Sequence, residues 1–163
     1  MHKKTQLYII LILMLTYLLP VKHGYILGST WEHFVYIFFH ANIFHLAGNC
    51  YCTWLILKNN NSWLKTLIPL YTLSVLASFI AYNNLPTIGF SAPLFVALGI
   101  NFHNTKNKKT YIPLLISVLA SLPFPLVNTR LHVTCFILGY LYTTLNHFIK
   151  EISHDNSRIN CRE

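Results

Sequence analysis

Acidic side chains are scarce in this chain, and their positions exclude several chemistries. The four acids among the 163 residues are Glu32, Glu151, Asp155 and Glu163. No apolar segment contains a pair of aspartates, which excludes an aspartyl protease acting inside a membrane. The zinc-binding pattern His-Glu-x-x-His is absent as well, which argues against a zinc metalloprotease. A Ser-His-Asp triad has no buried acid to serve as its third member.

Charged residues of any kind are few. They make up 10% of the chain, whereas 54% of it is hydrophobic. A soluble domain typically carries about 25% charged residues. The chain therefore has too little polarity to cover a water-facing surface, and we expect an integral membrane protein in contact with the lipid bilayer. The length allows one compact domain, and no Gly/Ser-rich or Pro-rich stretch marks a linker.

The net charge of +8 does not indicate a nucleic-acid partner. The basic residues form short clusters between apolar runs, with no basic helix face interleaved with aromatic residues. Ten of the 12 fall on one side of the expected membrane: Lys3, Lys4, Lys58, Lys65, Lys106, Lys108, Lys109, Lys150, Arg158 and Arg162. The other side receives Lys22 and Arg130. By the positive-inside rule, both termini are expected in the cytoplasm.

Six apolar segments predict the fold. They cover residues 6–20, 42–57, 63–82, 91–102, 111–126 and 130–148. We predict an all-α membrane protein, with a bundle of six transmembrane helices over residues 1–150 and a short cytoplasmic tail over residues 151–163. The fourth segment is too short to cross lipid alone. We therefore expect it to be a central helix that the others shield from lipid.

Polar residues within apolar segments are costly, so each is a candidate for function. His45 and Asn49 lie four residues apart in the second segment and share a helix face. Ser91 opens the fourth segment, two residues after Gly89, which permits a tight turn. His132 lies near the start of the sixth segment. These three segments enter the membrane from the same side, so their polar side chains are expected at one depth.

A Ser-His dyad is the chemistry that these residues allow. His132 would act as the base that activates the Ser91 hydroxyl. His45, Asn49 and the backbone N–H of Ser91 would donate hydrogen bonds to a developing oxyanion. The structural alternative is that Ser91 only caps a helix and that His45 and Asn49 only bond to neighbouring helices.

These motifs together resemble the rhomboid family of intramembrane serine proteases. The motif residues are His40, His45 and Asn49 on the second segment, Gly89 and Ser91 at the fourth, and His132 with Gly139 on the sixth. The resemblance covers nearly the whole chain. It implies a rhomboid-like membrane domain that cleaves single-span membrane proteins in or near their transmembrane segments.

The resemblance also implies a role for each motif residue. Ser91 would be the nucleophile, His132 the general base, and His45 and Asn49 the oxyanion donors, with His40 and Gly89 in supporting positions. We expect no cofactor and no metal. The chain shows no transit peptide and a short tail, so we expect a multi-pass protein of the plasma (inner) membrane.

Three positions depart from the family pattern. The residue after the serine is usually Gly and is Ala92 here. The small residue one turn after the base histidine is usually Gly and is Cys135 here. The loop between the first two segments, about residues 21–41, is the first loop. A Trp-Arg pair common in this loop of the family appears as Trp31-Glu32. Ala92 and Cys135 would affect how closely the fourth and sixth segments pack.

Two other functions remain open at this stage. One is a non-catalytic rhomboid-like protein that binds transmembrane helices in the same cavity. The other is a protein that handles metal or haem through His40, His45, Cys50 and Cys52, although the usual Cys-x-x-Cys spacing is absent.

Overall fold

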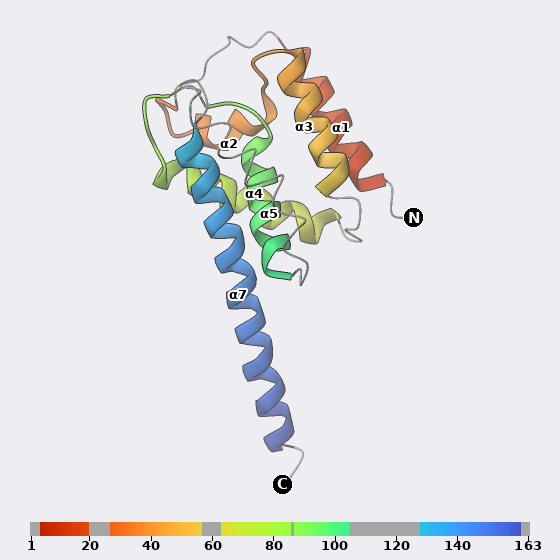
Figure 1. The fold of residues 1–163 in the computed structure, drawn as a ribbon, viewed down its shortest axis with the longest axis vertical. Helices are drawn as coiled ribbons and strands as arrows, with labels where there is room; N and C mark the ends of the chain where they lie inside the picture. Colours follow the sequence, from red (N-terminus) through yellow and green to blue (C-terminus); the bar gives the residue numbers. More distant parts are fainter. Residues whose placement is uncertain (1–3, 20–26, 57–62, 86, 105–127, 161–163) are drawn as a thin grey trace.

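Helices form the part of the chain that the structure describes. The computed structural model describes residues 4–19, 27–56, 63–85, 87–104 and 128–160. Its elements are α1 (Lys4–Tyr17), α2 (Glu32–Val35), the 3-10 turn η1 (Tyr36–Phe38), α3 (Ile43–Ile56), α4 (Trp63–Ile80), α5 (Ser91–Asn104) and α7 (Thr129–Asn160) (Figure 1). These residues contain no strand, which agrees with the predicted all-α class.

Five of the six predicted segments coincide with α1, α3, α4, α5 and α7. The predicted segment 111–126 lies outside the described residues. Taken singly, none of the described helices combines the length and the apolar character needed to cross a membrane. The helix α7 continues to Asn160, beyond the predicted end of the membrane domain at residue 150. The number of spans stays a prediction.

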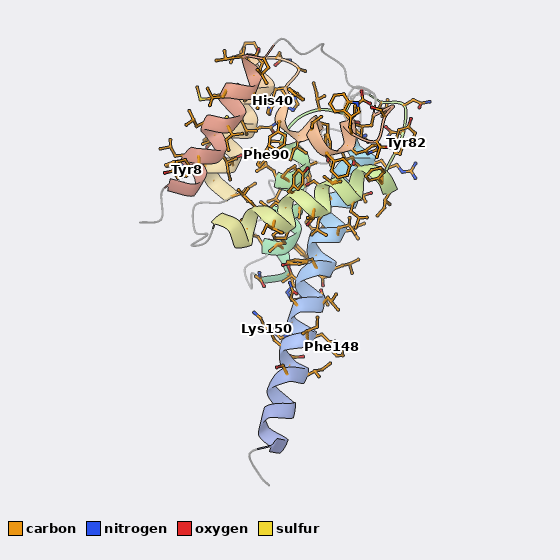
Figure 2. The ribbon with its side chains drawn as sticks, turned by 180° about the vertical axis from the view of Figure 1, so that it is seen from behind. Tyr8, His40, Tyr82, Phe90, Phe148 and Lys150 are labelled. Atoms are coloured by element: carbon orange, nitrogen blue, oxygen red, sulfur yellow. The ribbon has the colours of Figure 1, made fainter. Side chains whose placement is uncertain are left out.

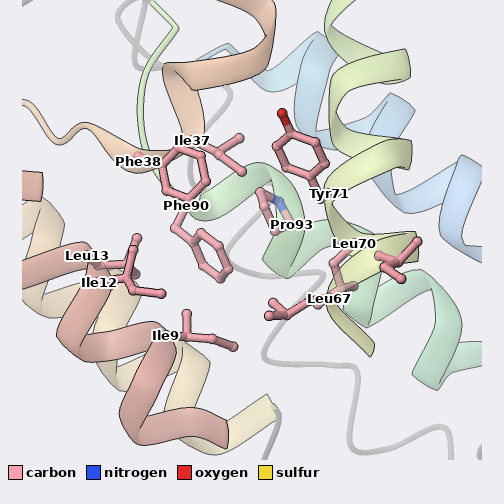
Figure 3. A pocket seen from close by; sticks show the side chains of 11 residues that line it. Ile9, Ile12, Leu13, Ile37, Phe38, Leu67, Leu70, Tyr71, Phe90 and Pro93 are labelled. Carbon is pink, nitrogen blue, oxygen red and sulfur yellow. The ribbon is translucent and has the colours of Figure 1, made fainter. Parts of the chain in front are cut away.

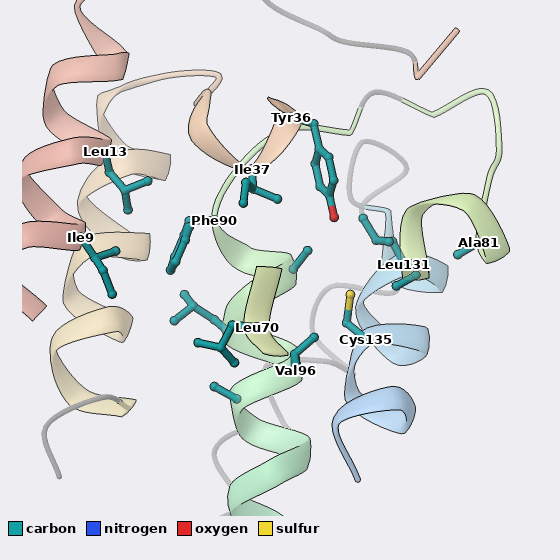
Figure 4. Close-up of a cluster of buried hydrophobic side chains, with 14 of the residues drawn as sticks. Ile9, Leu13, Tyr36, Ile37, Leu70, Ala81, Phe90, Val96, Leu131 and Cys135 are labelled. Atoms are coloured by element: carbon teal, nitrogen blue, oxygen red, sulfur yellow. The ribbon is translucent and has the colours of Figure 1, made fainter. Parts of the chain in front are cut away.

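The short helix α5 lies at the centre of the described helices. It contacts α3, α4, α7 and η1, and the side chains of Leu94, Val96 and Ala97 are buried. Figure 4 shows buried side chains of α1, η1, α4 and α7 gathered around the start of α5. The helix α4 runs crosswise to α5 and α7 (Figures 1 and 2). The expectation of a shielded central helix is confirmed for these elements.

The helices α5 and α7 approach each other closely because glycines lie at their contact. A Cβ atom added to Gly139 of α7 would collide with the backbone oxygen of Val96 in α5. From the other side, a Cβ atom added to Gly99 would collide with the backbone oxygen of Phe136 and lie 2.8 Å from the backbone nitrogen of Tyr140. Small residues permit this kind of backbone contact between helices.

The first loop is fastened internally by a carboxylate. The backbone N–H of Ser29 donates to Oε2 of Glu32 (2.8 Å), and the N–H of Glu32 donates to the Ser29 carbonyl (3.1 Å). These two bonds close a turn just before α2, with the Glu32 carboxylate accepting a backbone N–H from three residues earlier. The hydrogen bond from the Ser29 backbone lowers the pKa of the Glu32 carboxyl. Glu32 therefore has a structural role in the turn that leads into α2.

The first loop is also bound to α4. The ring of His33 stacks on Phe79, with 3.9 Å between the ring centroids, and its Nδ1 lies 2.8 Å from Oγ of Ser78. Burial lowers the pKa of His33, so the ring is neutral. The Ser78 hydroxyl donates to the Val75 carbonyl (2.7 Å), so the His33 N–H is the donor in the pair. The hydroxyl of Tyr36 donates to the backbone oxygen of Ser74 (3.0 Å).

An apolar cavity of about 360 Å³ lies between α1, η1, α4 and the start of α5 (Figure 3). Phe90, directly before Ser91, and Pro93, two residues after it, contribute to its wall. The hydroxyl of Tyr71, which also lines the cavity, donates to the Phe34 carbonyl (3.1 Å). Among the described residues that line the cavity, none therefore offers a free polar side chain for chemistry.

The substitution Gly139→Ala is expected to separate α5 from α7. Overpacking a filled contact typically costs about 1–3 kcal/mol, so the thermal unfolding midpoint of the detergent-purified protein should fall. The matched control is Gly48→Ala in α3, because nothing described lies within 4 Å of the added Cβ atom. Exchanging glycine for alanine in a helix gains about 0.5–1 kcal/mol, so this control should keep or raise the midpoint. Equal midpoints for the two variants would contradict the close contact.

Candidate active site

Ser91 is the first residue of α5, and the turn before it fixes its position. Gly89 has a φ of 113°, a backbone conformation that favours glycine. Its N–H donates to the backbone oxygen of Tyr36 (3.0 Å), which ties the turn to η1. The chain therefore enters α5 at a fixed angle, with the half-buried Ser91 at its start.

Ser91 meets His132 across the contact between α5 and α7. Oγ of Ser91 lies 2.9 Å from Nε2 of His132. The imidazole stacks on the ring of Phe95, with 4.4 Å between the centroids and an angle of 9° between the planes. Phe95 lies one helical turn after Ser91, so both side chains face α7. The structure thus brings together the two residues predicted to form the dyad.

The second ring nitrogen of His132 is not held by an acid. In the described part of the chain, its buried Nδ1 atom has no hydrogen-bond partner. A neutral imidazole with its proton on Nδ1 leaves Nε2 free to accept the hydroxyl proton of Ser91. The orientation of the ring then depends on Ser91, on the stacking partner Phe95 and on the position of α7.

His45 and Asn49 face the turn that precedes Ser91. A Cβ atom added to Gly89 would lie 2.5 Å from Cε1 and 2.6 Å from Nε2 of His45, and 3.2 Å from Nδ2 of Asn49. Asn42 caps α3 by accepting the N–H of His45 at its Oδ1 (2.9 Å). Within the described ranges, the buried Nδ2 of Asn49 lacks a hydrogen-bond partner. Two side chains able to donate hydrogen bonds therefore lie beside the start of α5.

His40 also contacts the turn at Gly89 and Phe90 that precedes Ser91. Its ring is buried, and its Nε2 accepts the backbone N–H of Phe90 at 3.4 Å. The His40 and His45 rings meet edge to face, with 5.2 Å between the centroids. Burial and the neighbouring His45 ring lower the pKa of His40 to about 4, so the ring is neutral and can accept a hydrogen bond. His40 thus holds the backbone of the residue that directly precedes Ser91.

Ala92 and Cys135 lie inside the contact between helices. Both side chains are almost fully buried, at 1% and 0% exposed. The glycine contacts described above persist beside them, and Ser91 still reaches His132. The methyl group and the thiol therefore fill space at this contact and do not separate the predicted dyad.

Sequence patterns did not indicate two of the residues that shape the site. Tyr36 contributes a backbone oxygen from η1, and Phe95 contributes an aromatic face from α5. A backbone carbonyl can accept a hydrogen bond whatever the residue type, so the sequence contained no signal for the role of Tyr36. Phe95 had a weak signal, because residues four apart on a helix share a face.

The residues of the proposed metal alternative do not converge in the described part of the chain. No group of three or more His, Cys, Asp or Glu side chains there is arranged to hold a metal ion. Cys52 is exposed, whereas His40 is buried. The arrangement can instead activate a hydroxyl and present hydrogen-bond donors next to it.

The substitution Gly89→Ala is expected to distort the turn before α5. The positive φ strains an alanine by about 1–3 kcal/mol, and its Cβ atom would lie within 2.6 Å of the His45 ring. The unfolding midpoint of the purified protein should therefore fall. The control Gly48→Ala adds the same methyl group in open space and should not lower it. A midpoint for Gly89→Ala equal to that of the control would show that the turn tolerates a side chain.

Comparison with known proteins places the chain in a family. A family model of the rhomboid domain matches residues 27–154, which include the second-segment motif, Gly89, Ser91 and His132. No curated protein and no solved structure matches the chain closely enough to support a comparison. With a match over most of its length, this chain belongs to the rhomboid family, whose members are membrane proteins.

Proposed function

We propose that this protein is a serine endopeptidase of the rhomboid type, which cleaves peptide bonds in or near the transmembrane segments of membrane proteins. The observation that carries the proposal is the 2.9 Å separation between Oγ of Ser91 and Nε2 of His132. A hydrogen bond of this length between a nucleophile and a base is the geometry that general-base catalysis needs.

Ser91 and His132 act together in both steps of the reaction, acylation and deacylation. Nε2 of His132 accepts the hydroxyl proton while Oγ of Ser91 attacks the carbonyl carbon of the peptide bond. The tetrahedral intermediate collapses when the imidazolium returns the proton to the leaving amine, which leaves an acyl group on Ser91. Water, deprotonated by His132 in turn, releases the acyl group as a carboxylic acid and restores the serine.

Stabilisation of the oxyanion falls to donors at the start of α5. The side chains of His45 and Asn49 lie next to the Gly89 turn, and the backbone N–H of Ser91 lies in the first turn of α5, where N–H groups have no partner within the helix. Donors held in place before the reaction need no reorganisation in the transition state.

The membrane setting completes the proposal. We assign the chain six spans from its six apolar segments, and both termini to the cytoplasm because ten of its 12 basic residues fall on one side. We also assign it to the plasma (inner) membrane. Its substrates are single-span membrane proteins whose helix can unwind near the outer face. No cofactor and no nucleic acid take part.

A non-catalytic relative that binds transmembrane helices is the second candidate. Ala92 favours it, because this buried methyl group replaces the usual glycine directly after the serine. In that case Ser91 would cap α5 and would not react with an electrophile.

Labelling with a serine-reactive fluorophosphonate probe decides between the two functions. We expect the detergent-purified wild type to be labelled, and both Ser91→Ala and His132→Ala to abolish the label, because the first removes the nucleophile and the second its base. Labelling is read as probe fluorescence on the protein band after electrophoresis.

The control for this experiment is Ser78→Ala. Ser78 is also buried and also bonded to a histidine, but its hydroxyl proton points to the Val75 carbonyl. This variant should keep the label. A wild type as unreactive as Ser91→Ala, beside an active rhomboid protease that is labelled, would favour the non-catalytic function.

Removing an oxyanion donor should slow the reaction without preventing binding. We expect His45→Ala and Asn49→Ala each to lower the labelling rate about 100-fold or more, the usual effect of losing one such donor. The control is His147→Ala, because His147 lies far along α7, is 65% exposed and pairs with Glu151. Rates for His45→Ala and Asn49→Ala that match the control would remove these two residues from the oxyanion site.

A further inference from the structure

Asn128 lies where three segments meet beside the Ser91–His132 pair. It directly precedes α7, four residues before His132, and is only 7% exposed. Its Oδ1 accepts the backbone N–H of Leu131 (3.1 Å), so it caps the N-terminus of α7. A cap of this kind uses one lone pair of the side-chain oxygen and leaves the amide group free for other bonds.

The amide of Asn128 uses its remaining bonds outside α7. Nδ2 donates to Oγ1 of Thr87 (2.8 Å) and to Oδ1 of Asn83 (3.2 Å). Nδ2 of Asn83 returns a bond to Oδ1 of Asn128 (3.1 Å). Both N–H groups and two acceptor positions of Asn128 are thereby occupied. One buried side chain thus joins α7 to the segment after α4 and to the segment before α5.

Thr87 continues this connection toward the nucleophile. It is 4% exposed and lies four residues before Ser91, and its hydroxyl donates to the Leu85 carbonyl (3.0 Å). The Thr87 oxygen therefore uses its own proton elsewhere and accepts the proton of Asn128. The bond between Asn128 and Thr87 links the start of α7, which carries His132, to the segment that precedes α5 and Ser91.

The position of α7 has a larger influence on the placement of the His132 imidazole than it would in a catalytic triad, where an acid also holds the ring. No acid in the described residues holds Nδ1 of His132, so the imidazole depends on its helix for its place. The glycine contact at Gly139 fixes α7 against α5 about two turns further along. Asn128 is a polar contact that holds α7 at the end where the proposed chemistry occurs.

We propose that Asn128 is a positioning residue, which holds the start of α7 against the Thr87 segment and so keeps Nε2 of His132 within hydrogen-bond distance of Oγ of Ser91. The proposal rests on the proposed protease function. The hydrogen bonds of the Asn128 side chain go to Leu131, Thr87 and Asn83 and so reach the reacting atoms only indirectly. A displacement of about 1 Å at a catalytic pair can lower the rate on the order of 100-fold.

The variant Asn128→Ser separates the cap from the cross-link. Serine keeps an N-cap oxygen for α7 but loses the two N–H groups that reach Thr87 and Asn83. With the fluorophosphonate probe, kinact should fall about 10- to 100-fold, whereas KI should stay close to the wild-type value. The control is Asn42→Ser, the same exchange at the exposed N-cap of α3, which should leave both constants near wild type.

Substitutions of Thr87 test the same bond from its other end. Thr87→Val removes the acceptor at nearly constant shape and should lower kinact as Asn128→Ser does, while Thr87→Ser keeps the acceptor and should retain activity. Because both single changes break the bond between Asn128 and Thr87, the double variant Thr87→Val/Asn128→Ser should be no slower than the slower single variant. A double-mutant cycle on the unfolding midpoint should show the same coupling.

The outcomes separate this proposal from the protease function. A wild type that is not labelled overturns both the protease function and the positioning role, even if the unfolding cycle shows coupling. A labelled wild type with Asn128→Ser labelled at the same rate overturns the positioning role alone. Additive effects of Thr87→Val and Asn128→Ser, or a KI that rises while kinact stays constant, would also overturn it.

Discussion

The contact between α5 and α7 is the constraint on which the site depends. Ser91 and His132 belong to different helices, and each is near the start of its own. Packed helix axes usually lie about 8–10 Å apart, and small residues at the crossing allow a closer approach. Gly99 and Gly139 bring backbone atoms of the two helices into direct contact. The 2.9 Å bond between Ser91 and His132 follows from that approach.

A second constraint acts on the segment that leads into α5. Its backbone is bonded on one side to η1, through Gly89 and the Tyr36 carbonyl, and to His40, through the N–H of Phe90. On its other side, the Thr87 hydroxyl of this segment accepts a hydrogen bond from Asn128 at the start of α7. Because η1 is itself anchored to α4 through the Tyr36 hydroxyl, the turn before the serine is braced by most of the surrounding elements. In the proposed function, this bracing would help to hold Ser91 in place without an acid as a third member.

The departures from the family pattern prove to be local adjustments. Ala92 and Cys135 are buried beside the glycine contact, which persists in their presence. The Glu32 carboxylate accepts the backbone N–H of Ser29, so it organises the first loop where the family usually has arginine. Each change keeps a hydrogen bond or a filled volume, and none removes a group that the proposed chemistry needs.

The sequence by itself determined the helical class, the positions of five helices, and a set of candidate site residues, although α7 extends twelve residues beyond the predicted end of its segment at residue 148. Apolar periodicity and the cost of polar groups in apolar segments are local properties, so they can be read without a structure. The predicted set Ser91, His132, His45 and Asn49 does converge on the turn at Gly89.

The tertiary structure decided how this set is held. The Tyr36 carbonyl, the ring of Phe95 and the amide of Asn128 act on residues from other parts of the fold, and such contacts have no periodic signature. Asn128 in particular looks like an ordinary helix cap in the sequence. Only the fold brings Thr87 and Asn83 within hydrogen-bond distance of the Asn128 Nδ2 group. Hydrogen bonds between distant segments depend on how the helices pack.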